Sequence, residues 1–596
     1  MLRTIRIPSP LKALLIGLGR LPSLTQWDDG RSGESMTRTT VLCLLTAALV
    51  VLWLTPGFSR ADQGRDEMMK SHRGGTVRLV AKSAGGTLDP QVNYAPLYNN
   101  YYSGVYDGLV TFKKAGGVES LKVVPDLAEQ MPTVTNQGQT YTFKLRDGIT
   151  FSNGQPLTTD DVVASLRRIF KVSSPTSGTW FNGIVGSDTC LANAATCTLE
   201  GGVVADKANR IVTINLKAPD AEFLHKLSMP HASILPADTA PRDAGIEPIP
   251  GTGPYAFLSY DPNQSLVWVR NPNFKEWSVE AQPDGYADRF ELHFGMTADA
   301  QVNAVINDQA DVMFDQPPAT RLAEIGTKFS SQVHLDPQLA LWYLPLNVNL
   351  APFDSPKARQ ALAYAIDRKA LINFFGGRNL ANPTCQVLPP GVQGYKPFCF
   401  YGKTPGSQWS APDLERAKQL VEESGTKGQP VTLVIDDGDI SRNVGSYLQS
   451  TLNAIGYNAS VKSLSANIQY GYIQNSSNNV QMSVTQWYGD YPAASDFLNV
   501  LLGCESFRPG SDSSPNMSGF CDKALQTTID KALLLGSTDP VAAGELWSSI
   551  DREAMQEVPM IPLFNPKQVT LVSKRLGNFQ FYTATNAWAY TLAWVQ

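Results

Sequence analysis

One apolar run, Val41 to Leu54, constrains the folding of this chain more than any other feature of its sequence. It follows Arg38 and leads to Ser59-Arg60-Ala61, in which the small residues Ser59 and Ala61 flank Arg60. About 20 apolar residues are needed to span a membrane, whereas a shorter run with these flanks is typical of a signal peptide. We therefore predict a cleaved signal peptide at 36–61, so that the rest of the chain folds after export. Residues 1–35 contain acidic side chains and are interpreted as an upstream extension.

A lipid anchor at Cys43 is the alternative to a fully released protein. Leu42 precedes this cysteine where a lipoprotein signal has a small residue, and the apolar run continues beyond it. We therefore expect a soluble periplasmic protein rather than a cell-surface lipoprotein.

Charge and length narrow the class of protein. Without residues 1–61, which hold seven basic and three acidic side chains, 42 basic and 51 acidic residues leave a net charge of −9. No basic cluster stands out, so nucleic acid is not an expected partner. A chain of 596 residues with 43% hydrophobic residues is too long for one core and should form two or more domains.

Six cysteines follow the predicted signal peptide and fall into three close pairs. In an oxidising compartment this spacing favours bonding between neighbours. The predicted disulfides are Cys190–Cys197, Cys385–Cys399 and Cys504–Cys521. Zinc is the alternative, but no Cys-x2-Cys spacing occurs and no histidine lies near a cysteine pair in sequence. We predict no metal site and no cofactor.

Alternating and periodic stretches predict strands and helices in the first half of the chain. Thr76–Ala81, Thr140–Arg146 and Arg210–Leu216 alternate as half-buried strands do. A helix should begin at Thr158, where carboxylates occupy the first turn. Residues 173–202, rich in Ser, Gly and Thr, are interpreted as an inserted loop.

The second half of the chain alternates between strand and helix. A helix is predicted from Ser355-Pro356 to Gly376-Gly377, a buried strand at Val431–Ile435, and a helix at Asn443–Ile455 closed by Gly456. This alternation is typical of an α/β domain with a partly parallel sheet.

An aromatic and acidic turn occupies residues 487–499. Asp490 stands on a Gly/Pro turn between Trp487, Tyr488 and Tyr491. The carboxylate could cap the turn while Trp487 packs in the core, or it could receive a small cation between aromatic walls. The turn by itself leaves both interpretations open.

Several segments resemble a known family, and they follow one another in its order. The strongest is Phe151-Ser-Asn-Gly-Gln-Pro-Leu157, with Thr158-Thr-Asp-Asp161 after it. Others are Thr87-Leu-Asp-Pro90, Gly251-Thr-Gly-Pro-Tyr255, Val269-Arg-Asn-Pro-Asn-Phe274 and the segment Pro352 to Arg368. Over about 500 residues the chain resembles the extracellular solute-binding proteins of family 5, which serve peptide- and nickel-type ABC importers.

The resemblance implies a fold. It predicts two α/β lobes of the periplasmic-binding-protein type (class II, cluster C), joined by two crossing strands. Lobe I would comprise 74–110, 235–316 and 562–596, with an extra subdomain at 111–234, and lobe II would comprise 317–561.

The resemblance also implies a binding site between the lobes. The family's amine anchor is the Asp of a Trp-x-x-Asp-Tyr segment, which here is Asp490, with Trp487, Tyr488 and Tyr491 as walls. Asn93 and Tyr94 would face this end from lobe I, unless that aromatic segment is core. Arg442 is the candidate for a ligand carboxylate, with a surface arginine as the alternative.

One departure from the family pattern lies in the same turn. The family commonly continues with Asp-Pro after Tyr-Pro, whereas Ala493-Ala494 stands here. The second acidic group of the loop is therefore absent or replaced by Asp496, which leaves the number of negative charges facing the ligand open.

The predicted function is that of a monomeric substrate-binding component of an ABC importer, which delivers short peptides to a membrane permease. The same receptor could instead carry an opine, an oligosaccharide, a metal chelate or haem, or serve as a sensor or chaperone. An exported hydrolase is disfavoured because neither Gly-x-Ser-x-Gly nor His-Glu-x-x-His occurs. We therefore do not expect an enzyme.

Overall fold

The computed structural model describes residues 67–94, 100–172 and 174–596. The predicted signal peptide at 36–61 and the extension at 1–35 lie outside the described residues. None of the helices in the described part of the chain combines the length and apolar character needed to cross a bilayer.

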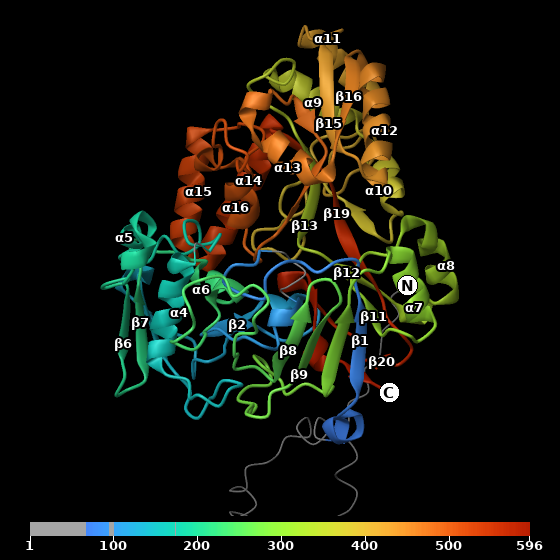
Figure 1. Cartoon of the computed structure of the whole chain (residues 1–596). Coiled ribbons are helices and arrows are strands. Elements are labelled where there is room, and N and C mark those ends of the chain that lie inside the picture. Colours follow the sequence, from blue (N-terminus) through green and yellow to red (C-terminus); the bar gives the residue numbers. More distant parts are fainter. Residues whose placement is uncertain (1–66, 95–99, 173) are drawn as a thin grey trace, which may run out of the picture. The chain divides into compact units, whose positions relative to one another are not determined.

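A five-stranded sheet in the order β11-β1-β10-β9-β8 organises the first part of the fold (Figure 1). Its strands are β1 (Thr76–Val80), β8 (Tyr255–Asp261), β9 (Ser265–Arg270), β10 (Arg289–His293) and β11 (Val312–Met313). β1 pairs in parallel with β10 and β11, while β9 pairs antiparallel with both its neighbours. The alternation of Val77 and Leu79 puts both into the core, which confirms the predicted strand.

A four-stranded sheet, β4-β5-β7-β6, forms a second layer with helix α4. Its elements are β4 (Thr133–Thr135), β5 (Thr140–Lys144), β6 (Val203–Asp206), β7 (Ile211–Asn215) and α4 (Thr159–Lys171). As predicted, α4 begins after Thr158, whose backbone N–H donates to Asp161 Oδ2 at 2.7 Å in a capping box. Residues 174–202 are not all loop as expected, because helix α5 (Ser187–Ala192) forms there and carries Cys190.

A parallel sheet, β16-β15-β17, organises the later part of the chain. Its strands are β15 (Pro430–Asp436), β16 (Asn458–Leu464) and β17 (Met482–Ser483), and α12 (Asp439–Ile455) connects β15 to β16. Gly456 ends α12 with a φ of 111°, as predicted. The helix starts four residues before the predicted Asn443, because the Asp436 carboxylate accepts the Gly438 N–H and the Ser441 hydroxyl and so organises its first turn.

The helix predicted from Ser355 to Gly376 is two helices. α9 (Pro356–Ala365) ends before Ile366, and α10 (Arg368–Phe375) begins after Asp367, so two residues separate the helices. Asp367 accounts for the break, because its side chain accepts the backbone N–H groups of residues 369 and 370 as an N-cap. The Tyr447 hydroxyl accepts the backbone N–H of Asp367, so this N–H has a partner without an intrahelical hydrogen bond.

The long strand β19 (Met560–Leu571) links the two parts of the fold (Figure 1). Its first half pairs with β13 (Ala340–Pro345) and β14 (Ala381–Pro383), and its second half pairs with β12 (Val333–Pro337). β18 (Thr485–Tyr488) adds to the far edge of β13. We refer to β1 to β11 with β20 to β23 as lobe I, and to β13 to α16 as lobe II.

The remaining elements pack on these sheets. The helices are α6 (Phe223–Leu227), α7 (Ala298–Ile306), α8 (Leu322–Lys328), α11 (Leu414–Glu423), α13 (Ala466–Gln474), α14 (Ser495–Leu502), α15 (Lys523–Gly536) and α16 (Pro540–Glu557). The short strands are β2 (Val110–Phe112), β3 (Val123–Pro125), β20 (Leu576–Gly577), β21 (Phe581–Tyr582), β22 (Ala587–Trp588) and β23 (Trp594–Val595). The three predicted disulfides, Cys190–Cys197, Cys385–Cys399 and Cys504–Cys521, are formed.

Candidate functional site

A cavity of about 990 Å³ is lined by both lobes and by β19. This volume is at the upper end of the range for small-molecule sites. Aromatic, amide and charged side chains line it, among them Tyr94, Trp180, His231 and Phe314 of lobe I, Tyr470, Trp487, Tyr488, Asp490, Arg508 and Asp512 of lobe II, and Gln568 of β19.

Asp490 reaches the cavity because β18 ends at Tyr488, two positions before it. Tyr488 is the last residue of β18 and lies opposite Ala340 of β13, and the Gly489 N–H then donates to the Leu339 carbonyl at 2.8 Å. A Cβ at Gly489 would lie 3.0 Å from the Phe497 ring, so a glycine lets the turn pack closely on α14. The turn thus holds the carboxylate at the cavity wall.

The electrostatic setting of Asp490 favours a cationic partner. Burial raises the pKa of this carboxyl group to about 6, while the hydrogen bond from the Tyr94 hydroxyl opposes the shift. No ion pair involving Asp490 occurs among the described residues. A ligand ammonium group at this position would therefore supply the missing countercharge.

Asp496 lies behind Asp490 rather than in the cavity lining. Its Oδ2 accepts the Asp490 backbone N–H at 2.8 Å, and its side chain is buried at the start of α14. Burial and the nearby Asp490 charge raise the pKa of Asp496 well above its usual range. Asp496 therefore shapes the turn, and Asp490 is the carboxylate that this turn presents to the cavity.

Of the other residues predicted for the site, Trp487, Tyr488 and Tyr94 line the cavity. Tyr94 packs against His231 of lobe I, with ring centroids 5.3 Å apart, and its hydroxyl lies near enough to Asp490 of lobe II to affect the pKa of that carboxyl group.

Tyr491, Asn93 and Arg442 are not among the residues that line the cavity. The buried Tyr491 hydroxyl donates to Glu222 Oε2 at 3.3 Å, so this side chain joins the lobes beside the cavity. Asn93 Nδ2 donates to the carbonyls of Gly85 and Thr87 at 3.1 and 2.7 Å and fixes that turn. Arg442, in the first turn of α12, donates to the Asp437 carbonyl.

Sequence reasoning missed Arg508, Trp180 and His231. Arg508 lies in the loop closed by Cys504–Cys521, and the predicted disulfide is the sequence signal that could have pointed to it. Trp180 belongs to the segment interpreted as an inserted loop, and His231 follows α6, a helix too short to show periodicity. Trp180 and His231 reach the cavity lining through the packing of segments that lie far from Asp490 in sequence.

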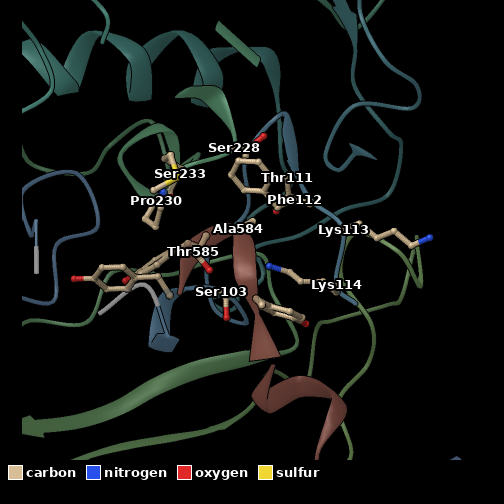
Figure 2. A pocket seen from close by; sticks show the side chains of 15 residues that line it. Ser103, Thr111, Phe112, Lys113, Lys114, Ser228, Pro230, Ser233, Ala584 and Thr585 are labelled. Carbon is tan, nitrogen blue, oxygen red and sulfur yellow. The ribbon is translucent and has the colours of Figure 1, made fainter. Parts of the chain in front are cut away.

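A second, smaller cavity of about 40 Å³ adjoins the first, since Met229 and Thr585 line both. Figure 2 shows Lys114 extending into this cavity near Ser103 and Ala584, whereas Lys113 points away from it. Lys113 forms an ion pair with Glu280 at 2.9 Å, while the Lys114 ammonium lies over the Tyr582 ring at 5.6 Å. Burial lowers the pKa of Lys114, and the buried carboxylates Asp126 and Asp107 oppose this shift. We assign this cavity to the packing of lobe I.

Within the described residues, no group of three or more His, Cys, Asp or Glu side chains gathers in a way that could hold a metal ion. The lining offers the carboxylates Asp490 and Asp512, the guanidinium group of Arg508, amide side chains and aromatic walls as its recognition chemistry.

Known binding proteins are similar to this chain over most of its length. Residues 122–508 match the family described as bacterial extracellular solute-binding proteins, family 5. Di/tripeptide-binding protein 2 of Pseudomonas aeruginosa (strain UCBPP-PA14) is 26% identical over 536 residues, covering 85% of this chain and 92% of the relative. Glutathione-binding protein GsiB of Escherichia coli O1:K1 / APEC is 27% identical over 506 residues, covering 83% and 89%.

The fold is also shared with solved structures. Clavulanic acid biosynthesis oligopeptide binding protein 2 superposes with a TM-score of 0.79 at 23% identity, covering 88% of this chain and 96% of that one. DppA from Helicobacter pylori, solved with the peptide STSA, gives a TM-score of 0.69 at 20% identity, covering 89% and 99%. The fold is thus the two-lobed α/β fold of periplasmic binding proteins, and the chain belongs to family 5 of the bacterial extracellular solute-binding proteins.

Proposed function

We propose that the protein is the exported substrate-binding component of an ABC importer and that it captures short peptides in the 990 Å³ cavity. Two relatives support a peptide ligand, because their names describe a di/tripeptide-binding and a glutathione-binding protein. The role is binding and delivery rather than catalysis.

The position of Asp490 carries this proposal. A half-buried carboxylate with a raised pKa, no cationic partner among the described residues and aromatic neighbours is suited to a ligand ammonium group. Trp487 and Tyr488 line the cavity on the strand that leads into this turn. The free amine of a peptide is the cation that we place there.

Arg508 replaces Arg442 as our candidate for the ligand carboxylate. Arg508 lines the cavity, and its Nη1 donates to the Ser513 carbonyl at 3.5 Å. A guanidinium group has five N–H donors in a planar fork that fits a carboxylate. A zwitterionic ligand would therefore find opposite charges within one cavity.

Calorimetry with the exported form tests the ligand class. We expect di- to pentapeptides and glutathione to include ligands of micromolar affinity or better, and N-acetylation to weaken them by about 100-fold or more, because a buried carboxylate loses its partner. Asp490→Asn should weaken the free peptides to the same extent and leave the acetylated peptides unchanged.

Asp512→Asn is the matched control, because Asp512 lines the same cavity but pairs with Asn475 at 2.8 Å. Its effect on free peptides should be small. Equal affinity of free and acetylated peptides for the unmodified protein would remove Asp490 from the proposed role, and the absence of any peptide binding would reject the peptide class.

We further propose that the ligand is handed to a membrane permease by a monomeric protein in the periplasm, after cleavage of residues 36–61. Closure would move lobe II, predicted at 317–561, against lobe I and its subdomain at 111–234. Loss of peptide uptake on deletion of the gene, restored by the intact protein but not by Asp490→Asn, is the expected result.

A further inference from the structure

The smaller cavity, of about 40 Å³, lies where three segments of lobe I meet: β2 with the residues after it, the residues after α6, and the turn between β21 and β22. We propose that this cavity binds a small monovalent anion, such as chloride, on the ammonium group of Lys114. The site is separate from the proposed position of the peptide, and the inference does not rest on the proposed function.

Lys114 is the charged side chain that extends into this cavity, whereas the neighbouring Lys113 points away from it (Figure 2). Lys113 pairs with Glu280 at 2.9 Å, but Lys114 has no ion pair and no side-chain hydrogen bond among the described residues. Its ammonium group lies 5.6 Å from the centre of the Tyr582 ring, a contact that uses none of its N–H groups in a regular hydrogen bond. The three N–H donors of the ammonium group therefore require acceptors inside the cavity.

Two buried carboxyl groups near Lys114 do not supply these acceptors. The Asp107 oxygens accept the Thr252 hydroxyl and the Gln282 amide, one on each oxygen. Asp107 and Asp126 act on Lys114 through space and not by a hydrogen bond. Burial and the charge of Asp107 raise the pKa of Asp126 well above its usual range, which weakens the repulsion between Asp126 and an anion. The remaining charge on Asp107 limits the site to singly charged anions.

Hydroxyl groups supply further donors around the cavity. Thr111 of β2, Ser233 after α6 and Thr585 after β21 come from the three segments that form the lining. Within the part of the chain that the structure describes, the hydroxyl groups of these three residues have no hydrogen-bond partner. Each can donate its O–H to an anion. The ammonium group and the hydroxyl groups thus offer donors from several segments to one small space.

The volume of the cavity limits the size of its ligand. One water molecule needs about 10–15 Å³, so a cavity of 40 Å³ admits a monatomic anion or a few water molecules and excludes a peptide. Water is the alternative occupant, but it brings no charge to the half-buried Lys114. Burial disfavours the charged form of this side chain and lowers its pKa. An anion in direct contact with the ammonium group offsets that cost, which water does not.

Thermal unfolding of the exported protein tests this site, with sodium gluconate replaced stepwise by sodium chloride at constant ionic strength. Gluconate is too large for the cavity. We expect chloride to raise the melting temperature by about 2 °C and the rise to saturate, because a ligand that binds only the folded state stabilises it. Lys114→Met should abolish the rise. Lys113→Met is the matched control and should keep it, because Lys113 points away from the cavity and pairs with Glu280.

Crystals of the unmodified protein grown in sodium bromide give a second readout that needs no variant. We expect an anomalous-scattering peak in the cavity, within hydrogen-bond distance of Lys114 Nζ. Absence of this peak would overturn the inference in favour of water. A peak combined with an undiminished chloride effect in Lys114→Met would show an adventitious ion only and would also overturn it. If Lys114→Met does not fold, the bromide peak decides alone. Neither measurement involves a peptide, so the proposed function can fail without affecting this result.

Discussion

Asp490 shows how one residue can couple ligand binding to proton binding. The carboxylate is half-buried in the turn after β18, and burial raises its pKa to about 6 in the unliganded protein. A bound ammonium group requires the ionised form, because a protonated carboxyl group offers no countercharge. Binding of a cationic ligand therefore competes with binding of a proton at the same group.

We predict that the affinity for free peptides falls as the pH is lowered through 6. Below that pH the dissociation constant should rise about tenfold per unit, because one proton must leave for each ammonium bound. Calorimetry of one dipeptide between pH 4.5 and 8 measures this dependence. Asp490→Asn should show a flat profile over pH 5 to 7, and an equally steep profile in that variant would contradict the assignment.

The stability of the unliganded protein provides an independent check. The pKa of Asp490 in the folded state lies above the usual value near 4, so ionisation of this group disfavours folding. Its destabilising effect is present above pH 6 and is lost as the pH falls from about 6 to 4. The melting temperature of Asp490→Asn should therefore exceed that of the unmodified protein at pH 7, and the difference should vanish near pH 4.

At the scale of the element, short loops that are anchored at both ends determine which side chains line the cavity. The loop from Cys504 to Cys521 follows α14 and precedes α15, and it brings Arg508, Asp512 and Ser513 into the lining. The disulfide closes a sequence separation of 17 residues. The predicted covalent pair thus holds a binding surface that the local sequence pattern did not indicate.

We expect a Cys504→Ala/Cys521→Ala double variant to bind peptides with a free carboxylate about tenfold more weakly, because Arg508 loses its fixed position. Peptides with an amidated carboxyl end should bind both proteins equally. The variant should also lose about 3 kcal/mol of the free energy of unfolding. Cys190→Ala/Cys197→Ala is the control, with a loss of stability alone, and an equal loss of affinity for amidated peptides would refute the role of the loop.

The break between α9 and α10 is a second element-scale feature. Asp367 caps α10 through the N–H groups of residues 369 and 370. Asp367→Ala should reduce the free energy of unfolding by about 1 kcal/mol, measured by denaturant titration, because two helix donors lose their acceptor. Asp367→Asn should retain most of the stability. A loss below about 0.3 kcal/mol for Asp367→Ala would show that packing, not the cap, ends α9.

At the scale of the whole molecule, Glu222 joins the lobes beside the cavity. This buried carboxylate, immediately before α6, accepts hydrogen bonds from Ser495, the first residue of α14, and from Tyr491. Burial raises its pKa, and the nearby Lys226 opposes the shift. Glu222, Tyr491 and Ser495 therefore join the two lobes next to the cavity that Tyr94 and Asp490 line.

Removal of the Glu222 contacts should shorten the lifetime of the peptide complex. We expect Glu222→Ala to raise the dissociation rate about tenfold with little change in the association rate, because these contacts hold the lobes together beside the cavity. Stopped-flow measurements on Ser495→Ala and on the double variant complete a double-mutant cycle. Asp188→Ala is the control, because Asp188 is an exposed carboxylate in the same subdomain as Glu222. Strictly additive effects of Glu222→Ala and Ser495→Ala would exclude their coupling.

Much of the fold was predictable because its determinants are local. Alternation in Thr76–Ala81 and Thr140–Arg146, the cap at Thr158 and the glycine at 456 act within a few residues of themselves, and the structure has the corresponding elements. The helix predicted through Asp367 was wrong, because periodicity does not reveal that a half-buried tyrosine from α12 satisfies a backbone donor there.

The sequence by itself determined the α/β class, the three disulfides and the carboxylate turn at Asp490, since each depends on neighbours along the chain. Only the tertiary structure decided which side chains share the cavity. Arg508, Trp180 and His231 line the same cavity as Asp490 although other elements carry them, while Tyr491, Asn93 and Arg442 form hydrogen bonds elsewhere and are not part of the lining. The physical reason is that burial and hydrogen bonding are satisfied across the packed lobes, where sequence separation carries no information about distance.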